Sequence, residues 1–98
     1  MAHWGWTTVA LGMDPPASRL YSTEPETVQW FVEAMKKPAP VREIKVDASE
    51  QPYWAETQKI SKGVTGVHVW VIKQLLQQGW EPVEGHLGAA FSLKKQFE

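Results

Sequence analysis

Residues Gly66 to Lys95, GVHVWVIKQLLQQGWEPVEGHLGAAFSLKK, decide the fold that the sequence predicts. The first half of this stretch carries apolar side chains at helical spacing, widened into a broad arc: Val67, Val69, Trp70, Val71, Ile72, Leu75 and Leu76. We expect a helix here, covered on more than one side because its apolar arc is so wide. Thr65 is the expected N-cap, since its hydroxyl can accept a hydrogen bond from a backbone N–H of the first turn.

Gly79 and Trp80 predict how this helix ends. Glycine suits the C′ position, where the left-handed conformation carries no Cβ penalty. With Gln78 as the C-cap, Trp80 lies at C″ and Leu75 at C3, and this pair makes the hydrophobic contact that accompanies a Schellman ending. The helix is therefore expected to stop at Gly79, with Trp80 folded back against it.

Two strands are expected after the helix. The first contains Val83. Because Pro82 cannot donate a hydrogen bond to a neighbouring strand, this strand is expected either to lie at an edge of the sheet or to begin near Pro82. The second runs from Ala89 to Lys95 and alternates apolar and polar residues with the period of a half-buried strand. The turn between them is expected at Gly85 to Gly88, with glycine at both ends.

The helix ending and the last strand resemble the small bacterial and phage domains of unknown function known as DUF4177-like. Those domains have a strand, a helix, the motif GWELV and a final strand that ends in basic residues. Here the motif reads Gly79-Trp80-Glu81-Pro82-Val83, with proline in place of the usual leucine, and the ending reads Ser92-Leu93-Lys94-Lys95. The resemblance covers about the second half of the chain, and it implies no assigned chemistry and no site residues.

A strand and a helix are expected in the first half of the chain. Trp4 to Leu11 is rich in aromatic and β-branched residues, and both faces of that strand are apolar enough for a central position. Gly12 to Ser18, with two consecutive prolines, predicts a loop. A capping box from Thr23 to Glu26 then begins a helix that Pro38 ends. Its buried stripe has helical spacing and leaves Trp30 to one side: Val28, Phe31, Val32 and Met35.

A further strand and a long connection precede the second helix. Arg42 to Ala48 alternates, so Ile44 and Val46 are expected to face inward. The connection from Ser49 to Gly63 is long, and connections of this length are usually functional or contain structure of their own. Helical spacing within it favours a short helix from Gln51 to Ile60 as the alternative to a loop.

The predicted fold is a single α+β domain over residues 1–98. It is a two-layer sandwich in which a four-stranded sheet carries both main helices on one face. The order along the chain is strand, helix, strand, helix, strand, strand, with the short helix near residues 51–60 as an optional addition. The second face of such a sheet is left for solvent or for a partner.

Composition and charge narrow the classes of function. The 98 residues carry ten basic and eleven acidic side chains without a block of like charge, which argues against nucleic acid as a partner. Cysteine is absent, so disulfides, thiolate metal sites and a cysteine nucleophile are excluded. No apolar run approaches the ~20 residues of a membrane span, and the N-terminus lacks a signal sequence. The default expectation is a cytoplasmic protein without membrane association.

No catalytic signature stands out in the sequence. His3, His68 and His86 lie far apart without metal-ligand spacing, so neither a metal nor another cofactor is expected. Glu84 and His86 make a candidate acid–base pair, but nothing positions a nucleophile beside them. We assign no catalytic residue and expect an interaction protein rather than an enzyme.

The first hypothesis of function is a non-catalytic interaction protein. Its six tryptophans supply an aromatic-rich surface, which would bind a protein partner or form a homo-oligomer. The candidate binding residues are Tyr53, Trp54 and Trp30. Because Tyr53 and Trp54 are adjacent, one can fill the core while the other stays at the surface; alternatively, both cover the end of the sheet as a lid.

The alternative hypothesis is a small-ligand or nucleotide-binding domain whose site lies at the start of the second helix. A minor enzyme acting at that site belongs to the same hypothesis. Its candidate residues are Lys62, Thr65 and His68. The free N–H groups of a helix N-terminus suit an anion, and Gly63 to Gly66 precedes one. The competing interpretation is that these glycines ease a tight approach to the helix and that His68 is a satisfied boundary residue.

Overall fold

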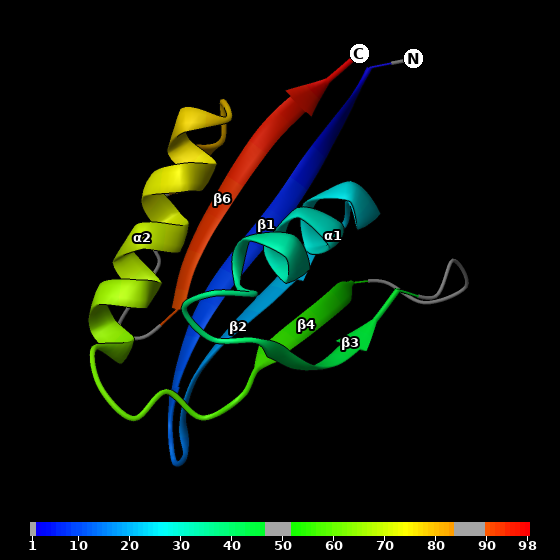
Figure 1. The fold of residues 1–98 in the computed structure, drawn as a ribbon. Helices are drawn as coiled ribbons and strands as arrows, with labels where there is room; N and C mark the ends of the chain where they lie inside the picture. The colour runs from blue at the N-terminus through cyan, green and yellow to red at the C-terminus, as the bar shows by residue number, and fades with distance from the viewer. Residues whose placement is uncertain (1, 47–51, 84–89) are drawn as a thin grey trace.

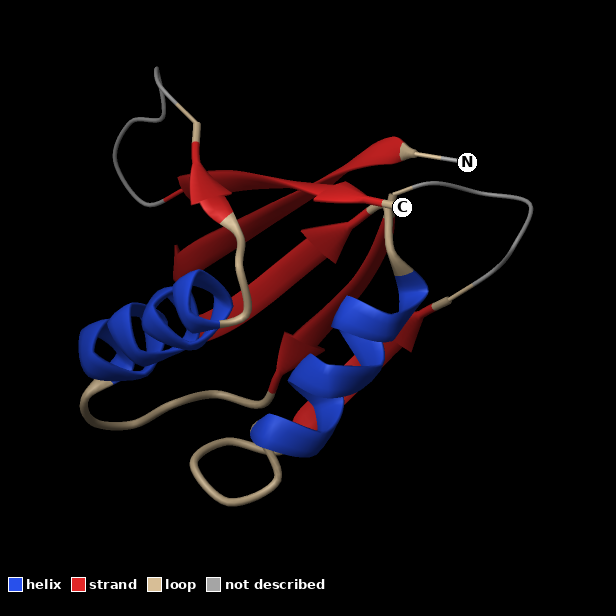
Figure 2. Ribbon diagram, turned by 90° about the horizontal axis from the view of Figure 1, so that it is seen from above, coloured by secondary structure: helices blue, strands red, loops and turns tan. Residues whose placement is uncertain are grey.

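In the computed structural model, which describes residues 2–46, 52–83 and 90–98, six strands form one antiparallel sheet and two helices cover one of its faces (Figures 1 and 2). The elements follow in chain order: β1 (His3–Met13), β2 (Pro16–Ser22), α1 (Pro25–Ala34), β3 (Val41–Lys45), β4 (Tyr53–Thr57), α2 (Val64–Gln77), β5 (Glu81–Pro82) and β6 (Ala90–Phe97). Across the sheet the order is β3-β4-β2-β1-β6-β5. The first and last strands therefore pair in its centre, and the two termini lie side by side (Figure 1).

The predicted four-stranded sheet is wrong, although the α+β class and the two helices on one face are as expected. One missed strand is β2, most of which lies beyond the loop that we expected at Gly12 to Ser18. Its buried side includes serines, whose polarity hides the alternation of a central strand. Ser22 is buried because its hydroxyl is hydrogen-bonded to that of Thr7, 3.0 Å away on β1.

The other missed strand is β4, where a loop or a short helix near residues 51–60 was expected. Tyr53, Ala55 and Thr57 are buried, and the residues between them are half-exposed, which is the period of a strand. A separation of four residues puts two side chains on the same face of a helix and also on the same face of a strand. Spacing alone therefore did not distinguish the two.

The core lies between the sheet and the helices. The three central strands each contribute a fully buried side chain to it: Val9, Leu20 and Leu93. The predicted stripe of α1 is confirmed at Val28, Phe31 and Met35, which are also fully buried, whereas Val32 is half-buried at the margin. α1 packs on β2 and β4, and α2 packs on β1 and β2.

The predicted capping box at the start of α1 is wrong. The N-cap is Glu24, which makes no side-chain capping hydrogen bond. The hydroxyl of Thr23 is engaged elsewhere, because it accepts a hydrogen bond from the backbone N–H of Trp6 at 2.9 Å and donates one to Glu24 Oε2 at 2.9 Å. Thr23 thus fastens the end of β2 to β1 rather than capping the helix.

The predicted ending of α2 is confirmed. The N–H of Trp80 donates to the carbonyl of Leu75 at 3.1 Å, and the N–H of Gly79 donates to the carbonyl of Leu76 at 3.2 Å. Gly79 has a φ of 98°, and Trp80 is only 3% exposed. These are the hydrogen bonds and the contact of a Schellman motif.

Two other expectations for α2 are wrong. Its N-cap is Gly63, at a φ of 73°, rather than Thr65. The helix is covered on the side facing the sheet only, since three apolar side chains remain well exposed: Val69 at 56%, Trp70 at 39% and Leu76 at 41%.

The edges of the sheet differ in part from expectation. β3 ends at Lys45, with a register irregularity between Val41 and Glu43. Ile44 was expected to face inward and lies on the helix side of the sheet, opposite the buried Ala55, but on this edge strand it stays 47% exposed. Val46, expected to face inward too, follows the end of β3 and is 37% exposed. β5 is an edge strand, which is one of the two positions expected for it. The expected turn at Gly85 to Gly88 lies outside the described residues.

Substitution by alanine should change the free energy of unfolding in opposite directions at two glycines, one inside α2 and one just after it. Gly79→Ala forces a side chain into the left-handed region and should lower the free energy of unfolding by about 1 kcal/mol. Gly66→Ala, inside α2 with no atom within 4 Å of the added Cβ, should raise it by up to about 1 kcal/mol. Urea unfolding of both variants measures the difference, and equal midpoints would contradict the Schellman ending.

Candidate functional site

The face of the sheet that points away from the helices, called here the open face, is not covered by any helix among the described residues (Figure 2). Residues directly opposite each other in paired strands point to the same face. The register therefore places on the open face the even-numbered residues of β1, β4 and β6 and the odd-numbered residues of β2 from Arg19 onward.

Four aromatic side chains lie on the open face: Trp4, Trp6, Tyr21 and Trp54. Trp4 and Trp6 on β1 are 46% and 47% exposed, which is high for the largest apolar side chains. Tyr21 and Trp54 are half-buried neighbours on β2 and β4. The open face is therefore the aromatic-rich surface of this fold.

Cations contact three of these four rings, those of Trp4, Tyr21 and Trp54. The guanidinium carbon of Arg19 lies 5.2 Å from the ring centroid of Trp54 and 5.7 Å from that of Tyr21. Arg19 Nη1 also donates a hydrogen bond to the Tyr21 hydroxyl at 2.8 Å. At the other end of the face, Lys94 Nζ lies 5.0 Å from the ring centroid of Trp4. These cation–π contacts fix the rings without covering them.

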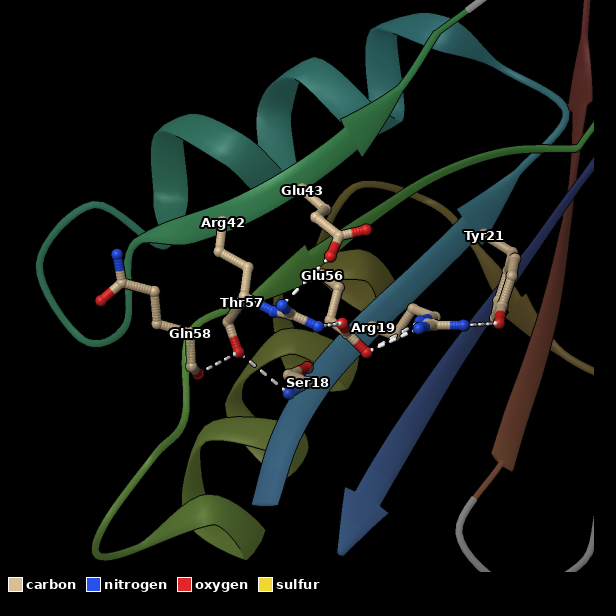
Figure 3. A network of polar contacts seen from close by, with 8 residues as sticks. All are labelled: Ser18, Arg19, Tyr21, Arg42, Glu43, Glu56, Thr57 and Gln58. Atoms are coloured by element: carbon tan, nitrogen blue, oxygen red, sulfur yellow. Dashed lines mark hydrogen bonds and ion pairs between the residues drawn. The ribbon is translucent and has the colours of Figure 1, made fainter. Parts of the chain in front are cut away.

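Glu56 is the centre of an ion-pair network on β2, β3 and β4 (Figure 3). Arg19 donates to Glu56 Oε1 from Nε at 3.0 Å and from Nη2 at 2.7 Å, while Arg42 Nη2 donates to Oε2 at 2.7 Å. Burial of the Glu56 carboxyl opposes its ionisation, but the hydrogen bonds from Arg42 and Arg19 outweigh burial and lower its pKa. The network ties the edge strand β3 to the central strand β2.

On β1 and β6, the open face is bulky at one end and flat at the other. Along β1 its side chains fall in size from two tryptophans to a glycine: Trp4, Trp6, Thr8, Ala10 and Gly12. At the paired positions of β6, two long side chains are followed by two small ones: Gln96, Lys94, Ser92 and Ala90. In the middle, the hydroxyls of Thr8 and Ser92 are hydrogen-bonded to each other at 3.0 Å. We call the part with Trp4 and Trp6 the bulky end and the part with Ala10 and Ala90 the flat end.

The three residues proposed for binding do not share one surface. Tyr53 is 7% exposed and lies in the core beneath the helices, whereas Trp54 lies on the open face. This agrees with the expectation that one of the two fills the core while the other stays at the surface. Trp30 is half-buried on α1, where it lines a cavity of about 350 Å³ with His3, Trp80 and Phe97. Of the three, only Trp54 belongs to the open face.

Sequence analysis missed the contribution of Trp4, Trp6 and Tyr21 to this surface. The alternation of residues 4 to 11 puts Trp4 and Trp6 on one face of a strand, but neither was named as a binding residue, because both faces of that strand are apolar enough for a central position. Tyr21 lies in β2, which was not predicted as a strand.

The three residues of the alternative site do not converge either. Lys62 and Thr65 are exposed, whereas His68 lies on the buried side of α2 and is 8% exposed. Among the described residues, His68 Nδ1 is buried without a hydrogen-bond partner, and burial lowers the pKa of the imidazole. His68 is therefore a neutral core residue and not part of a surface site with Lys62 and Thr65.

Residues 2–46, 52–83 and 90–98 contain neither a cluster of metal-ligating side chains nor a membrane-spanning helix. No group of three or more histidine, aspartate or glutamate side chains is placed there to hold a metal ion. Neither α1 nor α2 has the length and apolar character to cross a membrane. Glu84 and His86, the candidate acid–base pair, lie outside the described residues.

No known protein family, curated protein or solved structure matches this chain. The resemblance to the DUF4177-like domains therefore stays a prediction.

Removal of the Glu56 carboxylate should destabilise the fold. Glu56→Gln removes the negative charge and one of the two acceptor oxygens that Arg19 and Arg42 share, and it should lower the free energy of unfolding at neutral pH by about 1–2 kcal/mol. Because folding lowers the pKa of Glu56, its contribution is present above the ordinary value of 4.5 and is lost as the pH falls through the lowered value. Urea unfolding across this range should show wild type and variant converging in acid.

The control for Glu56 is Glu43→Gln. Glu43 also pairs with Arg42, at 3.1 Å, but its side chain is 50% exposed, so the loss should stay below about 0.5 kcal/mol. Equal losses for the two variants would show that the network around Glu56 has no special weight.

His68 should also make the free energy of unfolding depend on pH, but in the weakly acidic range above the one in which Glu56 acts. Its pKa is lowered from the ordinary 6.5, so the unfolded chain binds the proton more readily, and stability falls as the pH drops below that value. His68→Leu keeps an apolar group in the same place and should remove this part of the pH dependence. If wild type and His68→Leu lose unfolding free energy equally between about pH 7.5 and about pH 5.5, the imidazole is not neutral and buried as described.

Proposed function

We propose that this chain is a non-catalytic interaction protein whose open face binds a second copy of itself. The observation that carries the proposal is the gradient of side-chain size from the bulky end to the flat end. A protein interface needs complementary shapes, and a self-associating face must be complementary to itself.

A two-fold axis makes the open face self-complementary. The axis lies parallel to the face, perpendicular to the strands, and passes through the pair Thr8 and Ser92. It lays the bulky end of one copy over the flat end of the other, so that Trp6 meets Ala10 of the second copy and the reverse. Tyr21 and Trp54, which lie level with Thr8 in the sheet, then meet their own counterparts. Stacked sheets pack in this way, about 10 Å apart with their strands turned by about 30°.

The size of the face is sufficient for a weak dimer. Four strands span about 19 Å, and the stretch from Trp4 to Gly12 spans about 27 Å, so each copy offers on the order of 500 Å² of flat area. The relief of the tryptophan side chains increases the area removed from water. Stable complexes bury about 800 Å² per partner, so we expect a monomer–dimer equilibrium in the micromolar range.

The charge of the open face permits contact between identical copies. The described strands place four basic and three acidic side chains there: Arg19, Arg42, Lys45, Lys94, Glu43, Glu56 and Glu81. Arg19 and Arg42 already share Glu56 within one copy. Since the charges nearly balance, two faces would not repel each other strongly, and the aromatic rings would provide the attraction.

The alternative of a small-ligand or nucleotide site at Lys62, Thr65 and His68 has less support. His68 is buried, and Lys62 and Thr65 do not line a cavity with it. Catalysis has no specific observation in its favour, because the described part of the open face carries aromatic rings and paired charges rather than an activated nucleophile.

Two variants test the proposed dimer: one replaces the large residue of the contact by a small one, and the other replaces the small residue by a large one. Trp6→Ala should weaken self-association at least tenfold, because each contact loses a large apolar side chain. Ala10→Trp should weaken it as much, because two tryptophans collide at each contact. An equimolar mixture of the two variants restores one large and one small residue at both contacts and should dimerise close to wild type. Sedimentation equilibrium of each sample measures this.

Trp70→Ala is the control, since Trp70 is 39% exposed on α2, in the layer on the other side of the sheet. Trp70→Ala should leave self-association unchanged. In all variants the free energy of unfolding should stay within about 1 kcal/mol of the wild-type value. A monomeric wild type at a few hundred micromolar, or a mixture no better than its components, would reject self-association through this face.

A further inference from the structure

A groove of about 760 Å³ lies between the C-terminal end of α1 and the N-terminal half of α2. In Figure 1 the end of α1 points toward α2. Apolar side chains from both helices and from the turn after α1 line it: Ala34, Pro38, Val67 and Trp70. Its volume lies within the range of about 300–1,000 Å³ that is usual for small-molecule pockets, and apolar walls are usual for such pockets as well.

Basic side chains stand on one rim of this groove. Lys36 forms an ion pair with Glu33, whereas Lys37 has no hydrogen-bonding or ionic partner among the described residues. The rim therefore offers one ammonium group that is free to pair with a ligand. The neighbouring carboxylate of Glu33 would repel a second negative charge, so the rim matches a monoanion better than a dianion.

We infer that this groove binds a small amphipathic monoanion, an apolar chain or ring that ends in one carboxylate. The apolar body would lie against Val67 and Trp70, and the carboxylate would pair with Lys37 at the rim. The charge complementarity at Lys37 selects the acid over an alcohol or an amine with the same apolar body.

Gly66 keeps the groove open. It lines the cavity, and a Cβ added there would meet no atom within 4 Å. A larger side chain at this position has room to enter the space without a clash inside the protein. Gly66 is thus the position at which the groove can be filled by substitution.

The site lies on the helix side of the sheet and is independent of the proposed dimer. A variant that abolishes self-association through the open face, such as Ala10→Trp, should bind the monoanion as well as wild type does. Failure of one proposal leaves the other standing.

Titration calorimetry with decanoate, below its micelle concentration, tests the inference. We expect one decanoate per chain, with decyltrimethylammonium, which has the same tail and the opposite charge, binding at least tenfold more weakly. Lys37→Gln should weaken decanoate binding three- to tenfold and remove most of this preference. Because Lys37 is exposed, this variant should fold normally.

Gly66→Phe fills the groove and should reduce decanoate binding at least tenfold, whereas Gly66→Ala, the matched control for the backbone, should reduce it by less than threefold. Amide chemical shifts on adding decanoate should change at Gly63, Gly66 and Val67 and not at Trp6 or Tyr21. Binding of both amphiphiles with equal affinity, shift changes on the open face, or no binding at about 1 mM decanoate would overturn the inference.

Discussion

One-sided burial of the three central strands under α1 and α2 is the constraint on which the rest of the structure depends. Leu20 on β2 lies opposite Val9 on β1, Leu93 on β6 lies opposite Thr7, and Val9, Leu20 and Leu93 are completely buried on the side that the two helices cover. The chain has only two helices in its described residues, and both are used on this side. The opposite side of the same strands is therefore left with large aromatic residues and paired charges. The open face follows directly from how the core is made.

Much of the helical structure was predictable because its signals are local. The buried stripe of α1 and the Gly79-Trp80 ending of α2 depend on residues within two turns of each other. β2 and β4 were not predictable in the same way. Two of their buried polar side chains, Ser22 and Thr57, have hydrogen-bond partners on neighbouring strands. Those partners come from distant parts of the chain, so the local pattern carries no trace of them.

The candidate site shows the same division between local and distant information. The alternation of β1 predicts that Trp4 and Trp6 share a face, and adjacency predicts that Tyr53 and Trp54 separate. It does not predict that Trp4 and Trp54 lie on the same face, because this depends on the pairing of β1 with β2 and of β2 with β4. The groove depends on the approach of two helices, so its lining residues, such as Trp70, look like ordinary core residues in the sequence.

The pairing of β1 with β6 has a consequence for the order in which the protein is made. Trp6 lies opposite Lys94 in the middle of the sheet, so the strand that begins the described chain acquires one of its two neighbours only from the strand that ends it. During synthesis, β1 and β2 emerge early, but that edge of β1 stays unpaired until β6 has left the ribosome. Contacts between residues so far apart in sequence also slow folding, because the intervening chain must be ordered first. Until β6 has been made, the nascent chain thus exposes an unpaired edge of a tryptophan-rich strand, and such edges are sites where chains aggregate and where chaperones act.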